Sequence, residues 1–234
     1  RRHLPLLAYI CWTTKSEPPV GLRRIEHVIV DEAQDVTGLE WLLLRKINQT
    51  SAWTIIGDLN QRRSDHTYSN WEQVLDVVEP FDCGPVDTVQ QAYRSTKPIL
   101  EFANSLLPKG ERDVTSLRHD GPPPVVQRVD AKRVGHASLQ QALRLLGDYP
   151  SGTVAVIATR GKEIIDSLRS AGWTKSPQSG RPIWLKGSQE LTVLHHDHAR
   201  GLEFDAVVVV EPALFPQNYG RFGPLYTALT RANR

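Results

Sequence analysis

The stretch IEHVIVDEAQD, residues 25–35, joins a short apolar run to a cluster of acids. Val28, Ile29 and Val30 predict a buried strand, and Asp31 and Glu32 stand at its carboxyl end. In open α/β sheets, ligands bind outside the carboxyl ends of the strands. An aspartate there can hold Mg²⁺ through its water shell, and a glutamate can orient and deprotonate an attacking water. The alternative interpretation is a strand followed by an acid-capped helix, because acids also suit a helix N-terminus.

Length and composition describe an ordinary globular protein of one or two domains, with 234 residues, 40% of them hydrophobic and 23% charged. A net charge of +2 neither demands nor excludes nucleic acid. No apolar run approaches the ~20 residues of a membrane span. Cys11 and Cys83 form no metal or disulfide pattern, so we expect a cytoplasmic protein with no membrane partner. The sequence contains no methionine, which predicts a piece of a larger protein.

Apolar runs and helical periodicity alternate along the chain. They predict strands at 25–31, 53–56, 153–158, 191–194 and 206–210, another strand beginning at 88–89, and helices at 36–47, 71–78, 97–107, 139–146, 162–171 and 226–232. The segment 172–187, rich in Gly, Pro and Ser, is expected to be irregular. Alternating strands and helices predict an α/β fold with parallel sheets. The turn cluster at 82–85 predicts a boundary between two lobes.

Polar residues also follow later strands. Gln61, in IIGDLNQ (55–61), is neutral and can contact a terminal phosphate or the attacking water, although the segment taken by itself favours a polar surface loop. Arg94, in QAYRS (91–95), offers a rigid fork of donors to a phosphate, and its alternative is a surface ion pair.

Two further segments lie towards the end of the chain. In RGLEFD (200–205), Gly201 permits close backbone approach and Glu203 can accept a hydrogen bond from a ribose hydroxyl. In YTALTRA (226–232), Arg231 can stabilise charge on a γ-phosphate, or it can simply compensate the dipole at a helix C-terminus.

In this order, VIVDEAQD, IIGDLNQ, QAYRS, RGLEFD and YTALTRA resemble motifs II to VI of superfamily 1 helicases of the UvrD/Rep type. The resemblance covers most of residues 25–232. It implies a P-loop NTPase with two RecA-like lobes, with ATP bound between them and single-stranded or duplex DNA as partner. The chain would be the C-terminal part of that motor, with residues 1–84 in the first lobe and 85–234 in the second.

The resemblance also assigns roles to matching residues. Asp31 resembles the Mg²⁺ residue, Glu32 the catalytic base and Gln61 the γ-phosphate sensor. Arg94 and Arg231 resemble the two arginine fingers, and Glu203, beside Gly201, resembles an acid that contacts the nucleotide.

Departures from the family pattern qualify the expected activity. The chain contains no Gly-x-x-x-x-Gly-Lys-Ser/Thr loop, so we expect ATP hydrolysis of a larger parent protein and no useful turnover by this chain alone. Only residues 173–189 fill the interval where relatives insert a large subdomain. After motif III, Tyr68 or Trp71 can stack a base, or Trp71 can anchor the core. These features resemble the HelD branch, whose ATPase acts on RNA polymerase.

The run HHDH, residues 195–198, suggests a metal site at first sight. On a strand, His195 and Asp197 would face one side, and His196 and His198 the other. That alternation favours a polar strand end over metal binding.

Overall fold

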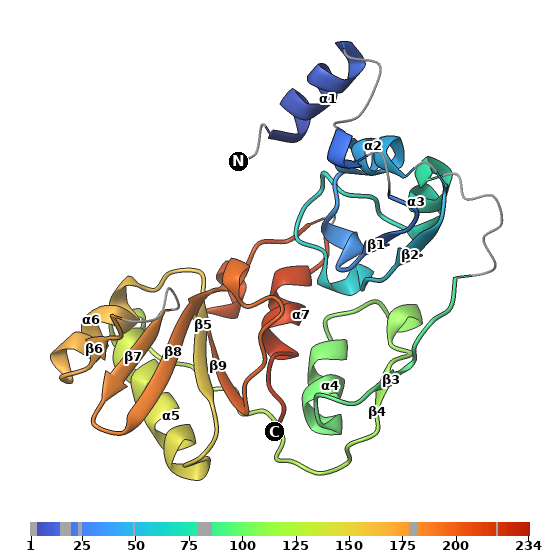
Figure 1. Cartoon of the computed structure of the whole chain (residues 1–234). Helices are drawn as coiled ribbons and strands as arrows, with labels where there is room; N and C mark the ends of the chain where they lie inside the picture. The colour runs from blue at the N-terminus through green and yellow to red at the C-terminus, as the bar shows by residue number, and fades with distance from the viewer. Residues whose placement is uncertain are drawn as a thin grey trace. The chain divides into compact units, whose positions relative to one another are not determined.

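The computed structural model describes residues 4–14, 20–22, 25–48, 50–78, 86–177, 182–218 and 220–234. The chain divides into two compact units, residues 1–88 and 89–234 (Figure 1). Each unit has a hydrophobic core of its own. The turn cluster at 82–85, where the sequence predicts a lobe boundary, lies outside the described residues, as does Cys83.

The first unit is built around a pair of parallel strands. Its elements are α1 (Leu4–Thr14), η1 (Val20–Leu22), β1 (Val28–Val30), η2 (Ala33–Asp35), α2 (Gly38–Ile47), β2 (Trp53–Ile55), η3 (Leu59–Gln61) and α3 (Trp71–Val78). Strand β1 pairs with β2 in parallel, with Val28 opposite Trp53 and Val30 opposite Ile55. The predicted strands and helices of this region are therefore present, α3 with the predicted bounds and β1, α2 and β2 with shorter ones.

The core of the first unit forms where α2 and α3 pack on the strands. Trp41 of α2 is fully buried there, and its ring meets the Trp53 ring edge-on at a centroid distance of 6.2 Å. Trp71 and Tyr68 pack against the same core, so the structure favours the core-anchor interpretation of Trp71 over base stacking. Helix α1, by contrast, buries none of its residues.

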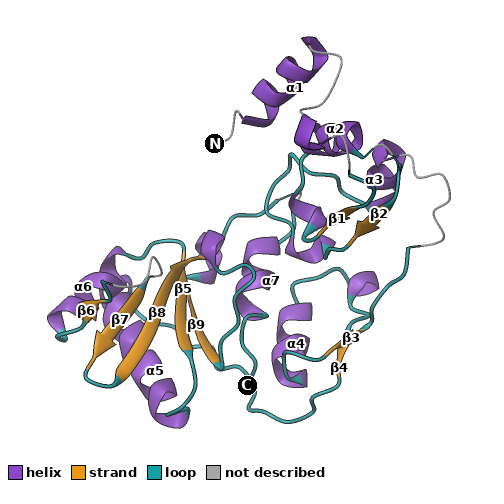
Figure 2. Cartoon of the chain, viewed as in Figure 1, coloured by secondary structure: helices purple, strands orange, loops and turns teal. Residues whose placement is uncertain are grey.

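The second unit carries a larger sheet. Its elements are β3 (Gln91–Ala92), α4 (Lys97–Asn104), η4 (Lys109–Glu111), β4 (Thr115–Ser116), η5 (Ala131–Arg133), α5 (Val134–Asp148), β5 (Val154–Ala158), α6 (Lys162–Ser170), β6 (Thr174–Lys175), β7 (Ile183–Lys186), β8 (Gln189–His195), η6 (His196–His198), β9 (Ala206–Val210), η7 (Pro212–Leu214) and α7 (Gly223–Leu229). The strand order of the sheet is β6-β7-β8-β5-β9, and β3 pairs separately with β4 (Figure 2).

Helices cover both faces of this sheet. Val154 and Val156 of β5 face a core that includes α5 and α6, whereas Ala155 and Ile157 face a core that includes α7. Burial on both faces explains the unbroken apolar run of β5. Strands β8, β5 and β9 are parallel, which confirms the predicted α/β class with parallel strands.

The edge of the sheet departs from the sequence-based expectation. The segment 172–187 is not simply irregular, because β6 and β7 pair antiparallel within it and β7 continues antiparallel onto β8. Trp184 explains the difference: its side chain is buried in the sheet core, and the Arg169 guanidinium lies 5.8 Å from the centre of its ring. Nowhere in the described segments does a helix have the length and apolarity needed to cross a bilayer.

Candidate functional site

The turn after β1 holds the first unit's two acids in a constrained backbone. Glu32 adopts a left-handed conformation, with φ of 55° and ψ of 39°, which costs a residue other than glycine about 1–3 kcal/mol. The Asp31 carboxylate accepts the backbone N–H of Glu32 at 2.7 Å. The next residue, Ala33, is buried and donates its N–H to the carbonyl of Ile56 at 2.9 Å. The surrounding packing therefore keeps Asp31 and Glu32 in one arrangement.

A buried amide links this turn to the segment after β2. Gln34 is 2% exposed, and its Nε2 donates to Oε2 of Glu32 at 2.7 Å. Its Oε1 accepts the backbone N–H of Asp58 at 3.0 Å. Gln34 therefore fixes the Glu32 carboxylate relative to the neighbouring strand end, a role for which the sequence pattern gave no sign.

Gln61 belongs to the same hydrogen-bonded chain. Its Nε2 donates to Oδ2 of Asp58 at 2.9 Å, while Oδ1 of Asp58 accepts the backbone N–H of Asn60 at 2.9 Å. A Cβ placed on Gly57 would lie 2.6 Å from Oε1 of Gln34, so only glycine fits beside the amide. The first unit thus joins three predicted site residues in one network: Asp31, Glu32 and Gln61.

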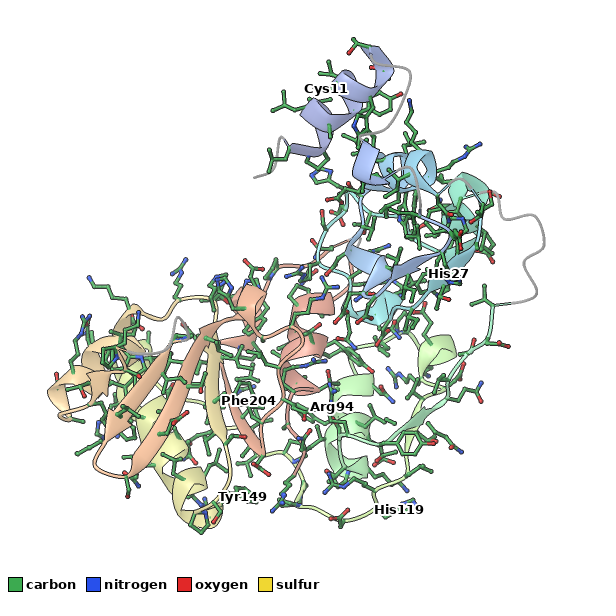
Figure 3. The ribbon with its side chains drawn as sticks, in the orientation of Figure 1. Cys11, His27, Arg94, His119, Tyr149 and Phe204 are labelled. Carbon is green, nitrogen blue, oxygen red and sulfur yellow. The ribbon has the colours of Figure 1, made fainter. Side chains whose placement is uncertain are left out.

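In the second unit, Arg94 and Glu203 form an ion pair. Nε of Arg94 lies 2.7 Å from Oε2 of Glu203, and their side chains are 50% and 56% exposed. Figure 3 labels Arg94 and also Phe204, which follows Glu203 in the sequence. An ion pair this exposed contributes about 0–1 kcal/mol to stability. Each of the two side chains can therefore leave the other and bind a different partner at little cost in free energy.

Arg231 lies beside the same segment and is buried, with 4% of its surface exposed. Its Nε donates to the carbonyl of Thr227 at 3.1 Å, and its Nη1 donates to the carbonyl of Leu202 at 3.3 Å. Helix α7 ends at Leu229, so Arg231 follows the helix and does not lie inside it as predicted. The bond to Thr227 satisfies a carbonyl at the helix end, which matches the helix-terminus interpretation. The bond to Leu202 also brings Arg231 to the segment that holds Gly201 and Glu203.

Gly201 has a φ of +66°, a conformation that favours glycine. A Cβ built on it would meet no atom within 4 Å, so this glycine serves the backbone conformation and leaves open space beside it.

A second network, also missed from the sequence, joins the Arg94 loop to the segment that carries Arg231. The buried hydroxyl of Ser95 donates to the carbonyls of Ala232 at 3.0 Å and Thr230 at 3.3 Å. Nη1 of Arg118 donates to the carbonyl of Arg94 at 2.9 Å and to that of Asn233 at 2.7 Å. These bonds fix the backbones of the two candidate arginines relative to each other.

The run HHDH does not continue the strand. Strand β8 ends at His195, and residues 196–198 form the 3₁₀ turn η6. The predicted alternation of side chains over both faces is therefore wrong, and ligand atoms of His195, His196 and Asp197 lie within 4.8 Å of one another.

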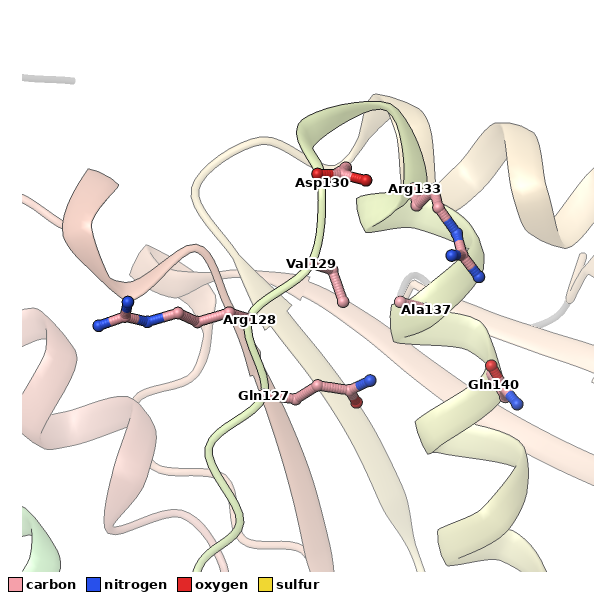
Figure 4. A pocket seen from close by; sticks show the side chains of 7 residues that line it. All are labelled: Gln127, Arg128, Val129, Asp130, Arg133, Ala137 and Gln140. Atoms are coloured by element: carbon pink, nitrogen blue, oxygen red, sulfur yellow. The ribbon is translucent and has the colours of Figure 1, made fainter.

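One surface depression of the second unit lies elsewhere. It is lined mostly by polar side chains from the segment 127–133 and from the start of α5, namely Gln127, Arg128, Val129, Asp130, Arg133, Ala137 and Gln140 (Figure 4). None of the predicted site residues lines it, and in Figure 4 the guanidinium groups of Arg128 and Arg133 extend away from each other. It does not form part of the candidate site.

Comparison with known proteins finds similarity to DNA helicases over part of the chain. The relatives include the ATP-dependent DNA helicase Srs2 of Schizosaccharomyces pombe, 32% identical over 38% of this chain, and UvrD1 of Mycobacterium leprae, 31% identical over 39%. The helicase Rep of Buchnera aphidicola is 28% identical over 36% of the chain. The matched regions span 10%, 13% and 13% of the lengths of Srs2, UvrD1 and Rep. No family model matches the chain. The chain therefore contains a helicase-like region.

Proposed function

We propose that this chain supplies the acids, the glutamine and the arginines of the nucleotide site in an ATP-driven superfamily 1 helicase or translocase of the UvrD/Rep type. The hydrogen-bonded chain from Glu32 through Gln34 and Asp58 to Gln61 is the observation that carries the proposal. An ordinary surface loop needs neither a strained glutamate nor a buried amide between two strand ends. The similarity to three ATP-dependent DNA helicases supports the same function.

The residues of the first unit fit a magnesium-nucleotide site by their chemistry. Asp31 and Glu32 offer carboxylate oxygens, the ligands that Mg²⁺ prefers. When bound, Mg²⁺ neutralises charge on the β- and γ-phosphates. In our proposal Asp31 holds the ion through its water shell. Glu32 accepts the proton of the attacking water, and the Gln61 amide contacts the γ-phosphate or that water.

The second unit offers cations and a base-stacking surface. Arg94 and Arg231 are proposed to donate hydrogen bonds to the phosphoryl oxygens, where negative charge develops during hydrolysis. Glu203, released from Arg94, accepts a hydrogen bond from a ribose hydroxyl, and Gly201 places no side chain beside it. Tyr93, adjacent to Arg94 and 70% exposed, presents an aromatic ring on which a base can stack.

The proposal assigns DNA as the polymer on which the motor acts, because the relatives are DNA helicases. It also requires a phosphate-binding loop from outside these 234 residues, which contain no Gly-x-x-x-x-Gly-Lys-Ser/Thr sequence. Without that loop the β- and γ-phosphates have neither a backbone cradle nor a lysine.

The test of the catalytic base is the substitution Glu32→Gln in a longer protein that carries this chain together with a phosphate-binding loop. We expect ATP turnover to fall about 10²–10⁴-fold, the usual contribution of a general base, while ATP affinity stays nearly unchanged. Glu26→Gln is the matched control, because Glu26 is exposed ahead of the same strand. Normal turnover in Glu32→Gln would remove Glu32 from the proposed mechanism.

A second candidate is an ATPase of the HelD type that remodels RNA polymerase. The compact second unit favours it, since the interval before β8 holds only short antiparallel edge strands in its described part. Binding to immobilised core RNA polymerase, compared with binding to single-stranded DNA of mixed sequence, separates the two candidates. Saturable polymerase binding without DNA binding would replace the helicase proposal with this one.

A further inference from the structure

The residues His195, His196 and Asp197 form a compact group of metal-ligating side chains outside the proposed nucleotide site. Their positions follow from the backbone, because a 3₁₀ turn rotates successive residues by about 120°, whereas a strand alternates them by 180°. Nδ1 of His195 lies 3.3 Å from Oδ2 of Asp197, and Nδ1 of His196 lies 3.3 Å from Oδ1 of Asp197. One ligand atom from each residue lies within 4.8 Å of the others.

The two separations of 3.3 Å, which involve different oxygens of Asp197, suit a small divalent ion once the exposed side chains adjust around it. Zinc binds imidazole nitrogen at about 2.0–2.1 Å and carboxylate oxygen at about 2.0–2.2 Å in tetrahedral geometry, which places neighbouring ligand atoms about 3.3 Å apart. Imidazole ligands favour Zn²⁺, Co²⁺, Ni²⁺ and Cu²⁺ over Mg²⁺ and Ca²⁺. Two imidazoles and one carboxylate leave a fourth position for water or for another ligand.

Burial preorganises one ligand and leaves the other two adjustable. The His196 side chain is 6% exposed, and its ring packs on Phe215 at a centroid distance of 5.3 Å. The side chains of His195 and Asp197 are 41% and 55% exposed, so they can rotate to close on an ion. A bound ion would replace the long contact of 3.4 Å between the Asp197 backbone N–H and Nδ1 of His195.

We propose that His195, His196 and Asp197 bind one divalent transition-metal ion of the zinc class. The site lies between β8 and the segment that holds Gly201 and Glu203, so an ion there braces the backbone ahead of those residues. This inference is independent of the proposed nucleotide function, because it rests on the imidazole ligands and on a different class of metal.

Titration with Co²⁺ tests the site, because tetrahedral Co²⁺ gives strong visible ligand-field absorption and reports its ligands directly. We expect one Co²⁺ per chain and full displacement by Zn²⁺, which binds such ligands more tightly. His195→Ala and Asp197→Asn should each weaken binding at least tenfold, by analogy with the ~10–100-fold cost of altering even the outer partners of metal ligands.

The controls separate this site from other imidazoles and from thiols. His136→Ala, an exposed histidine on α5 of the same unit, should leave Co²⁺ affinity unchanged. A background with Cys11→Ser and Cys83→Ser should retain the absorption. Far-ultraviolet circular dichroism checks that each variant folds. His196→Ala removes a buried ring. If that variant unfolds, the test rests on the variants of the two exposed ligands, His195→Ala and Asp197→Asn. Equal affinity in wild type, His195→Ala and Asp197→Asn, or no saturable absorption, would overturn the proposal.

Discussion

Gln34 shows how one side chain can set the geometry of a candidate active site. Its amide nitrogen donates to Glu32, and its amide oxygen accepts from the backbone of Asp58. The residue is almost completely buried. A buried polar group that loses its partner costs about 1–3 kcal/mol. Gln34 therefore stabilises the first unit and also fixes the Glu32 carboxylate.

Gln34→Leu keeps the side-chain volume roughly constant and removes both hydrogen bonds. We expect the first unit to lose about 1–3 kcal/mol of unfolding free energy, because the part-buried N–H of Asp58 loses its acceptor. Urea unfolding followed by tryptophan fluorescence detects this change, since Trp41, Trp53 and Trp71 belong to that unit, while Trp173 and Trp184 report the second unit in the same experiment. Gln73→Leu, at an exposed position of α3, is the control and should cost less. An equal loss in both variants would contradict the role assigned to Gln34.

The candidate acids and arginines could be predicted from the sequence, whereas the residues that hold them in place could not. Glu32 and Gln61 follow apolar runs, so their places at strand ends could be predicted from the pattern alone. Gln34, Ser95 and Arg118 could not, because each of them has a backbone partner that is distant in sequence. Whether the predicted residues perform the assigned chemistry stays a prediction.

The contact between helices α5 and α6 depends on a glycine. A Cβ on Gly135 would lie 2.3 Å from the carbonyl oxygen of Glu163, a backbone atom that cannot move aside cheaply. We expect Gly135→Ala to destabilise the second unit by about 1–3 kcal/mol, the usual cost of overpacking. Gly147, in the same helix, has open space on that side, because a Cβ added there would meet no atom within 4 Å.

Gly147→Ala is therefore the matched control, for which we expect the opposite change in stability. It should stabilise the unit by about 0.4–1 kcal/mol, because alanine reduces the entropy of the unfolded chain. Thermal unfolding by circular dichroism measures both variants. Destabilisation by Gly147→Ala, or no effect from Gly135→Ala, would show that the packing of α5 on α6 is not as described.

Strands and helices with strong apolar patterns matched their predictions, and short polar elements did not. The run 206–210 is a strand with the predicted bounds, because four valines and an alanine favour extended backbone, although its three central valines are only partly buried at the sheet edge. The pairing of β6 with β7 escaped prediction, since its stability comes from the edge of a sheet formed by distant residues. The turn at 196–198 escaped for a similar reason: the apolar run of β8 gave no sign of where the strand ends.

The molecule as a whole contains two compact units but no phosphate-binding loop sequence. We therefore expect the isolated chain to show no ATP turnover above a blank containing Mg²⁺ and ATP. Release of inorganic phosphate, measured at several protein concentrations, checks this expectation. Turnover that scales with protein concentration and disappears in Glu32→Gln would show that the loop is not required.

Our central proposal is that the carboxylates of the first unit and the arginines of the second act on the same nucleotide. A double-mutant cycle of Glu32→Gln and Arg94→Ala, assayed for ATP hydrolysis in a longer protein with a phosphate-binding loop, tests it most directly. Arginine fingers contribute about 10³–10⁵-fold, and residues that act as a unit are strongly non-additive. We predict that each single variant loses most activity and that the double variant is little slower than the slower single one. Near-normal hydrolysis by Arg94→Ala, or two losses that multiply in full, would contradict the claim.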